Sequence, residues 1–417
     1  MKYIAFLCIV SLCISCKEYN PEIKSTDTCE KLPCDFAPYI WKKRITDEAY
    51  TYSCIDLPIV YKNAGLVATR RNDSTFFQMI EPETGNVRWE LHRKIRHDNG
   101  PLFEYEITQG YIFNNTLITP FWGEHVSGFE KIDLENGTIV TEITNHPEVK
   151  MDFDVVVSGV DSLYFFKDSK MNYEKNAFED FVMYGNIYTN NFQKLCDLPL
   201  LEENQNDSIV IQLVSPTIID NEIHVLIGYT CNDTGYISLY NKNSKTWVYA
   251  NINYDVPWFS SYCLISYPYF FLPGGREVNG VSETTFICGD IKTGDVVWTN
   301  ENSFGTYGML EINENLIVIL NYFANKIYGV EKNTGKILWN IENSMPCRYM
   351  QLLNGIVYFD TGYIYAIDAE TGKKLWYLEP HDGTRFNECK VVPGKDGKKG
   401  HILASSDKHV YCFEAIK

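Results

Sequence analysis

Few residues in this sequence have the types and spacing that would support chemistry. His92 and His97 lie five positions apart in a basic run, which fits a solvated loop better than a metal pair. No Cys-x-x-Cys pair follows Cys16, and the sequence has no Gly-x-Ser-x-Gly, His-Glu-x-x-His or phosphate-binding Gly-rich motif. We therefore predict no catalytic residue, no metal site and no cofactor. Acidic residues are abundant, so a carboxylate pair for glycoside hydrolysis stays open, although no spacing selects one.

The composition describes a folded chain that does not favour nucleic acid. Hydrophobic residues make up 45% of the 417 residues and aromatic residues 14%, which suits half-buried strands. The formal net charge is −17, and that field repels a polyphosphate.

The first residues predict export. An apolar run from Tyr3 to Ile14 is shorter than the ~20 residues of a membrane helix and fits a signal peptide over residues 1–15. Cys13-Ile14-Ser15-Cys16 resembles a bacterial lipobox, which implies a lipid on Cys16 and a membrane attachment through it; the alternative is an ordinary signal peptide cleaved nearby. Residues 16–36 read as a polar tether.

The export signal also suggests an address. Lys17-Glu18 resembles the surface-export signal of Bacteroidetes-type lipoproteins. We expect an outer-membrane lipoprotein, and leave open whether it faces the periplasm or the surface. Disulfides are permitted in that compartment, and Cys29 with Cys34 is the best local pair. Others, such as Cys288 and Cys412, lie in apolar runs and fit buried thiols equally well.

A repeat organises residues 37–417. The pattern acid-x-x-Thr-Gly-x-x-x-Trp occurs four times in full, and a degraded copy surrounds Gly137. The turn glycine or its substitute falls at positions 85, 137, 191, 245, 294, 335 and 372, in steps of 37 to 54 residues. Its glycine and tryptophan members are Gly85, Trp89, Gly294, Trp298, Gly335, Trp339, Gly372 and Trp376.

Each copy predicts a four-stranded unit, with strands a to d in chain order. The Thr-Gly turn joins strands c and d, and its glycine suits a positive φ. The acid accepts hydrogen bonds from its own turn, and the tryptophan sits on strand d. An eighth unit, 400–414, ends before its Trp-bearing strand, and Ala37–Arg44 offers that strand with Trp41. We therefore predict a ring closed by the N-terminal strand.

The Thr-Gly-x-x-x-Trp repeat resembles the quinoprotein-type, or PQQ-like, repeat family over nearly the whole chain. The resemblance implies an all-β, eight-bladed β-propeller of four-stranded antiparallel blades. Quinoprotein dehydrogenases of this family hold PQQ beneath a vicinal Cys-Cys disulfide, and this sequence has no Cys-Cys dipeptide. A PQQ-dependent dehydrogenase is therefore the least favoured function. The family also includes an assembly scaffold of the outer-membrane barrel machinery.

The connections indicate where a partner would bind. In a propeller, the b–c loops and the d–a segments share one face. The b–c connections look expanded at 120–125, 167–180 and 273–279, and variable loops on a rigid scaffold commonly carry binding. The candidate contact residues on this face are Trp122, Trp258, Arg276, Tyr307, Arg348 and Arg385.

These observations favour a monomeric, non-catalytic, lipid-anchored scaffold that contacts an envelope protein or glycan through the long-loop face. The alternative is a carbohydrate- or peptide-active enzyme with its site in the central funnel.

Overall fold

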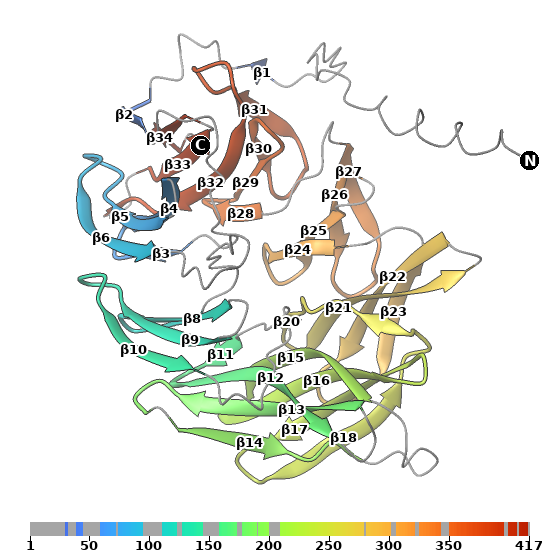
Figure 1. Ribbon diagram of the computed structural model, residues 1–417. Coiled ribbons are helices and arrows are strands. Elements are labelled where there is room, and N and C mark those ends of the chain that lie inside the picture. Colours follow the sequence, from blue (N-terminus) through green and yellow to red (C-terminus); the bar gives the residue numbers. More distant parts are fainter. Residues whose placement is uncertain are drawn as a thin grey trace, which may run out of the picture.

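Short turns reverse the chain between successive strands, and the described residues form eight separate sheets, which are antiparallel except for one added parallel strand. The computed structural model describes residues 30–31, 39–44, 59–71, 74–94, 111–122, 127–144, 158–172, 177–189, 191–199, 209–278, 281–301, 306–321, 325–342, 350–395, 399–406 and 408–415. No helix long and apolar enough to cross a membrane occurs in these segments. The sheets follow one another along the chain as the blades of an eight-bladed propeller (Figure 1).

Blade 1 contains β3 (Val60–Tyr61), β4 (Ala64–Arg71), β5 (Ser74–Ile80) and β6 (Val87–Lys94), and blade 2 contains β7 (Tyr111–Phe113), β8 (Thr116–Trp122), β9 (Ser127–Asp133) and β10 (Ile139–Thr144). Blade 3 contains β11 (Ser158–Val160), β12 (Leu163–Asn172), β13 (Ala177–Asn186) and β14 (Phe192–Cys196). Blade 4 contains β15 (Ile209–Ile219), β16 (Glu222–Cys231), β17 (Thr234–Asn241) and β18 (Thr246–Asn253).

Blade 5 contains β19 (Trp258–Phe259), β20 (Leu264–Ser266), β21 (Tyr269–Val278), β22 (Val281–Asp290) and β23 (Val296–Glu301), and blade 6 contains β24 (Thr306–Glu311), β25 (Leu316–Asn321), β26 (Lys326–Glu331) and β27 (Ile337–Glu342). Blade 7 contains β28 (Met350–Leu353), β29 (Ile356–Asp360), β30 (Ile364–Asp368) and β31 (Lys374–Leu378), together with β1 (Glu30–Lys31). Blade 8 contains β32 (Phe386–Val392), β33 (His401–Ser406) and β34 (His409–Glu414), together with β2 (Trp41–Arg44).

The N-terminal strand completes the last blade, as the sequence predicts. Strand β2 pairs antiparallel with β34, so that Trp41 lies opposite Cys412 and Lys42 opposite Tyr411. In Figure 1 both strands lie beside the C-terminus. Because β2 covers the outer edge of β34, that edge is not left open.

One strand was not expected. Strand β1, which falls within the expected tether, pairs in parallel with the outer strand of blade 7, and Glu30 lies opposite Trp376. Blade 7 therefore has five strands. The expected signal peptide, Cys16, the Lys17-Glu18 pair and the Cys29–Cys34 pair lie outside the described residues.

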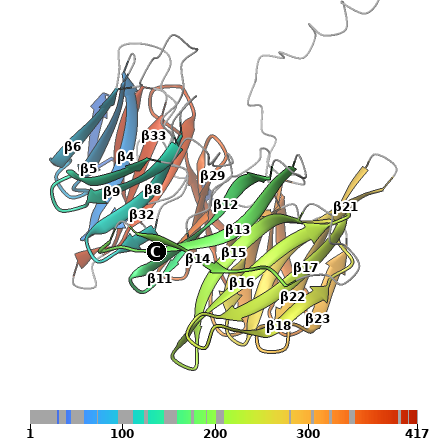
Figure 2. The ribbon, with the colours of Figure 1, turned by 60° about the horizontal axis from the view of Figure 1, so that its bottom comes forward.

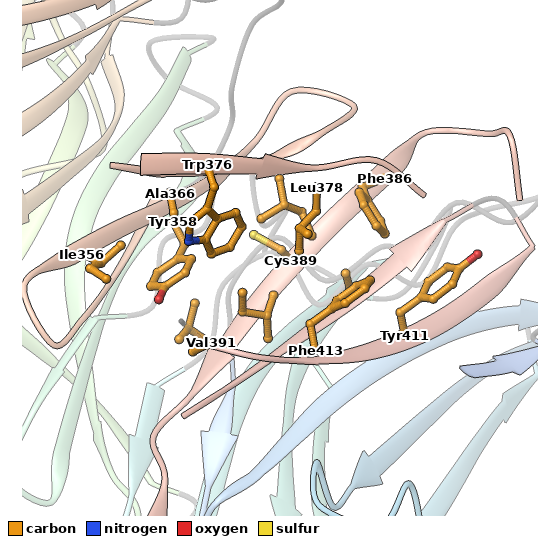
Figure 3. Close-up of a cluster of buried hydrophobic side chains, with 14 residues drawn as sticks. Ile356, Tyr358, Ala366, Trp376, Leu378, Phe386, Cys389, Val391, Tyr411 and Phe413 are labelled. Carbon is orange, nitrogen blue, oxygen red and sulfur yellow. The ribbon is translucent and has the colours of Figure 1, made fainter. Parts of the chain in front are cut away.

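The core is divided among the interfaces between blades. Eight clusters of buried hydrophobic side chains are present, one between each pair of neighbouring blades, including the pair formed by blades 8 and 1. Figure 3 shows the cluster between blades 7 and 8, in which Trp376 and Tyr358 face Cys389, Val391 and Phe413. The ring is thus held together by burial at every joint.

The repeat motif supplies a polar and steric clasp at most of these joints. The Asp290 carboxylate accepts hydrogen bonds from the backbone N–H groups of Lys292 (2.8 Å) and Thr293 (3.1 Å), and Gly294 has a φ of +76°. The tryptophan of one blade then packs on the turn of the next blade. Trp298 donates from Nε1 to the Lys332 carbonyl oxygen (2.7 Å) and covers Gly335.

The same clasp recurs around the ring. Trp89 covers Gly137, Trp339 covers Gly372, and Trp41 covers Gly85. Trp41 lies in the closing strand, so this strand supplies the contact of blade 8 with the turn of blade 1. In blade 4 the ring that covers the next turn belongs to Tyr249, which packs on Gly294. Trp376 differs: it is buried in the interface with blade 8, which has no Thr-Gly turn to receive it.

Two cysteines of the apolar strand runs are buried thiols. Cys288 and Cys412 are free and fully buried, and burial raises the pKa of each thiol to about 12. Both behave as small core side chains and not as disulfide partners.

The described residues of the expanded b–c connections lie in paired strands, which corrects the sequence prediction that they form loops. The pairing of β12 with β13 continues from Leu163–Asn186 to Asn172–Ala177, and that of β21 with β22 continues to Val278–Val281 (Figure 2). In blade 2, Pro120 and Trp122 also lie in a strand, since Trp122 is opposite Ser127. The paired strands of the blades therefore continue into these connections.

Candidate functional site at the closing blade

The sequence-predicted contact residues are spread over several blades. Trp122 lies in β8 of blade 2, and Tyr307 lies in β24 of blade 6. Trp258 pairs with Gly275 in the sheet of blade 5, so Arg276 is one position further along the neighbouring strand, where side chains point to the opposite face. Arg385 is exposed in the segment between β31 and β32. Arg348 lies outside the described residues.

Arg385 borders a polar cluster that the sequence analysis missed. The segment that enters blade 8 carries Asp382, while Ser406 ends β33 and His409 begins β34 on either side of the b–c turn. The Asp382 carboxylate accepts hydrogen bonds from Ser406 Oγ (2.6 Å), from His409 Nδ1 (2.8 Å) and from Thr384 Oγ1 (2.6 Å). A d–a segment and a b–c turn are thus joined at one end of the blade, which agrees with the predicted sharing of a face. We call Asp382, Thr384, Ser406 and His409 the closing-blade clamp.

The clamp is largely buried, and its hydrogen bonds stabilise the charged form of Asp382. The side chain of Asp382 is only 5% exposed, and that of His409 is 16% exposed. Burial alone would raise the pKa of Asp382, but the hydrogen bonds from Ser406, Thr384 and His409 outweigh it and hold this pKa well below its usual range. The carboxylate therefore stays charged and fixed at neutral pH.

Although the clamp contains a serine, a histidine and an aspartate, its geometry does not make Ser406 a nucleophile. Ser406 Oγ donates to the carboxylate, and it accepts the backbone N–H groups of Lys408 (3.3 Å) and His409 (3.0 Å). The imidazole is bound to the same carboxylate, whereas an activated serine would donate to the imidazole. The clamp therefore holds two connections together. Within the segments that the structure describes, no group of three His, Cys, Asp or Glu side chains could hold a metal.

Aromatic and basic side chains surround the clamp. The rings of Tyr39 and His381 lie 5.3 Å apart, and that of Tyr39 lies 5.9 Å from the ring of Tyr411. Tyr39 is 38% exposed, and His381 and Arg385 are also exposed. A rigid base thus presents aromatic and cationic groups to solvent. The His-Asp-Gly-Thr run at 381–384 was the available signal, because aspartate and threonine two residues apart favour a tight hydrogen-bonded turn.

A second polar cluster joins blades 5 and 6. Lys332 Nζ is buried and donates to Ser266 Oγ (2.7 Å) and to Glu311 Oε1. Burial raises the pKa of Glu311, but hydrogen bonds from Lys332 and Ser266 outweigh it and lower this pKa overall. Since its partners are structural, this carboxylate serves as a link between blades.

The clamp makes a pH-dependent contribution to stability, which Asp382→Asn tests. Because the pKa of Asp382 is depressed on folding, its contribution is present above the unfolded value near ~4 and is lost as pH falls through the folded value. We expect the variant to be about 2 kcal/mol less stable at pH 7. Urea unfolding between pH 7 and pH 3 should show a smaller loss of stability on acidification for the variant than for the wild type.

Asp220→Asn is the matched control, because the Asp220 side chain is 77% exposed and pairs only with exposed Lys292 in the described structure. It should change stability by less than ~0.5 kcal/mol at either pH. Parallel pH profiles for Asp382→Asn and the wild type would contradict a charged clamp.

Part of the chain matches a known protein family. Residues 271–415 match the family described as "Outer membrane protein assembly factor BamB", a family of PQQ-like repeats. This stretch contains three of the four complete Thr-Gly-x-x-x-Trp copies and the closing blade. The chain is an eight-bladed β-propeller, and residues 271–415 of it match a family of PQQ-like repeats. No curated protein sequence matches it.

Solved structures share the fold of this propeller. The dihydro-heme d1 dehydrogenase NirN is similar with a TM-score of 0.56 and 11% identity, over 93% of this chain and 81% of that one. Sqt1 of Saccharomyces cerevisiae gives 0.55 and 9%, over 90% and 98%. The quinohemoprotein alcohol dehydrogenase of Comamonas testosteroni gives 0.53 and 9%, over 90% and 76%. At these identities the likeness concerns the fold alone.

The vicinal disulfide that covers PQQ in quinoprotein dehydrogenases has no counterpart in this sequence. The described cysteines are free thiols in separate strands or segments, and Cys389 and Cys412 of the closing blade are buried in different interblade clusters. A vicinal disulfide cannot form from them, since no two cysteines are adjacent in the sequence.

Proposed function

We propose that this propeller is a lipid-anchored binding scaffold of the cell envelope, without catalysis of its own, that holds an envelope protein or glycan on the face carrying the b–c hairpins and d–a segments. The observation that carries the proposal is the closing-blade clamp. It fixes two connections of this face and surrounds them with exposed Tyr39, His381 and Arg385. Aromatic side chains and arginine are the types most enriched at binding hot spots.

Two further observations support it. The lipobox-like segment ending at Cys16 would place the chain at a membrane, and the family match over residues 271–415 names an outer-membrane assembly factor. The Ser406 hydroxyl is used to fix the turn and not to attack a substrate.

The anchor is tested by Cys16→Ser. We expect the wild type to incorporate labelled palmitate and to sediment with membranes, whereas the variant should lose the label and move to the soluble fraction. An unlabelled wild-type protein would contradict the anchor and favour an ordinary signal peptide.

The binding face is tested by cross-linking in intact envelopes, followed by purification of this chain. The double variant His381→Ala/Arg385→Ala should lose the cross-linked partner, while Lys336→Ala, on an exposed c–d turn at the other face, should retain it. Equal recovery from both variants, or a hydrolysed glycan or peptide in place of a retained partner, would contradict the proposal.

A further inference from the structure

Cationic residues gather on one blade of an otherwise acidic chain. The net charge is −17, yet the closing strand β2 reads Trp41-Lys42-Lys43-Arg44. We propose that the outer edge of blade 8 lies against a bilayer surface rich in anionic phospholipid. The proposal rests on the lipid anchor of the proposed function for its setting, and it concerns the cations of β2 and Lys408, which adjoin the partner residues His381 and Arg385 but do not include them.

Strand register brings the cations together. Lys43 lies opposite Val410 and Arg44 opposite His409, so the end of β2 reaches the turn that carries exposed Lys408. At the same end of the blade, Phe386 pairs with Ser406, which places exposed Arg385 next to this turn. Three of the four strands therefore carry a cation at this end or just before it. We call Lys42, Lys43, Arg44 and Lys408 the basic edge.

The described acidic groups near this edge have partners of their own, and Arg44 also takes part in an interaction. The Asp382 carboxylate is buried and accepts hydrogen bonds from Ser406 and His409, so its negative charge is stabilised within the clamp and not at the surface. Glu414 lies at the opposite end of β34 and pairs with Lys399 (3.6 Å). Glu379 is half-buried and has an interaction of its own, and the side chains of Glu388 and Asp407 lie outside the described residues.

Apolar and aromatic groups adjoin the basic edge, as expected for a membrane surface. Tyr39 and Ile40 precede β2 and are 38% and 45% exposed. Lys42 Nζ lies 5.4 Å from the centre of the buried Tyr411 ring, which positions this ammonium group beside them. Tyrosine is enriched at the membrane–water interface, and lysine and arginine are attracted by anionic headgroups.

The path of the N-terminal segment agrees with this orientation. Strand β1 pairs with the outer strand of blade 7, and β2 then forms the outer strand of blade 8, so the chain reaches the propeller along these two neighbouring edges (Figure 1). Only thirteen residues separate Cys16 from Glu30 in the sequence. A lipid on Cys16 would therefore hold the edges of blades 7 and 8, and not the far side of the ring, near the bilayer.

Vesicle sedimentation tests the basic edge without the anchor. The full chain with Cys16→Ser should bind phosphatidylglycerol-containing vesicles and bind phosphatidylcholine vesicles much more weakly, the latter measuring any contribution of the apolar segment 3–14. Adding Lys42→Gln, Lys43→Gln and Lys408→Gln should weaken binding to the anionic vesicles by at least tenfold, since each lysine near such a surface changes partitioning by roughly fivefold. Raising the salt from 0.1 M to 0.5 M should have a similar effect.

The matched control removes the same charge from the other face, through Lys245→Gln, Lys336→Gln and Lys373→Gln on exposed c–d turns. It should bind like the parent. Equal loss in both triple variants, equal binding to neutral vesicles, or specific displacement by inorganic phosphate at matched ionic strength would overturn the proposal. Because every protein in this test lacks Cys16, the result is independent of whether the anchor exists, and a failure of either idea can be distinguished from failure of the other.

Discussion

Replacing Trp41 with alanine should lower the free energy of unfolding by about 3 kcal/mol. The indole ring covers the turn at Gly85, and its Nε1 donates to the Pro82 carbonyl oxygen (2.7 Å), which is the clasp between blades 8 and 1. Its loss removes both the packing and the bond at the one joint where the blade is assembled from the two ends of the chain. Urea unfolding followed by far-ultraviolet circular dichroism measures the change without relying on tryptophan fluorescence.

Two controls separate the causes. Trp41→Phe keeps an aromatic ring over the turn and should lose only about 1 kcal/mol, mainly the hydrogen bond. Lys43→Ala keeps the strand and does not touch the clasp, and should change stability by less than ~0.5 kcal/mol. If Trp41→Ala is as stable as Lys43→Ala, the N-terminal strand does not hold the ring closed.

The second large effect is expected at a turn glycine, where Gly372→Ala should cost about 3 kcal/mol. Gly372 has a φ of +69°, and a Cβ there would lie 2.5 Å from Trp339 Cδ2. The substitution therefore adds an unfavourable left-handed conformation to an overpacked contact. Thermal or urea unfolding checks the loss.

Gly355 of the same blade supplies the comparison. Its φ is +75°, and a Cβ there would meet nothing within 4 Å, so Gly355→Ala isolates the backbone cost and should lose only about 1 kcal/mol. Equal losses at the two positions would mean that the tryptophan moves aside freely, and that the clasp contributes little to the joint between blades 6 and 7.

The repeat made most of the fold predictable from the sequence. A glycine that needs a positive φ and a tryptophan four residues later recur because both are required by one contact, and each copy therefore marks a joint. The closing strand was predicted within Ala37–Arg44, and it is β2 (Trp41–Arg44). The closure followed from counting, since an eighth blade lacked its outer strand and Trp41 lacked a turn of its own.

What could not be predicted involves contacts without a local pattern. Tyr249 replaces the clasp tryptophan in blade 4, and Lys245 takes a φ of 58° where five other copies have glycine. Strand β1 pairs through its backbone, which leaves no periodicity in two residues. The clamp joins Asp382 to Ser406 and His409 across 24 and 27 positions, and only the folded blade shows that one carboxylate serves both. The contact residues of the long-loop face remain predictions.

The way the ring is closed also governs the order in which the molecule can assemble. Cys412 Sγ donates to the Pro82 carbonyl oxygen (3.1 Å) across 330 positions, and Trp41 reaches the same carbonyl from the other end of the chain. Contacts between such distant segments form slowly, because the entropy of closing the loop precedes any gain from pairing. Strand β2 is therefore synthesised early but is the last strand to pair. Until β2 has paired, the edge of β34 is exposed, and a partly folded molecule could pair there with a strand of another molecule.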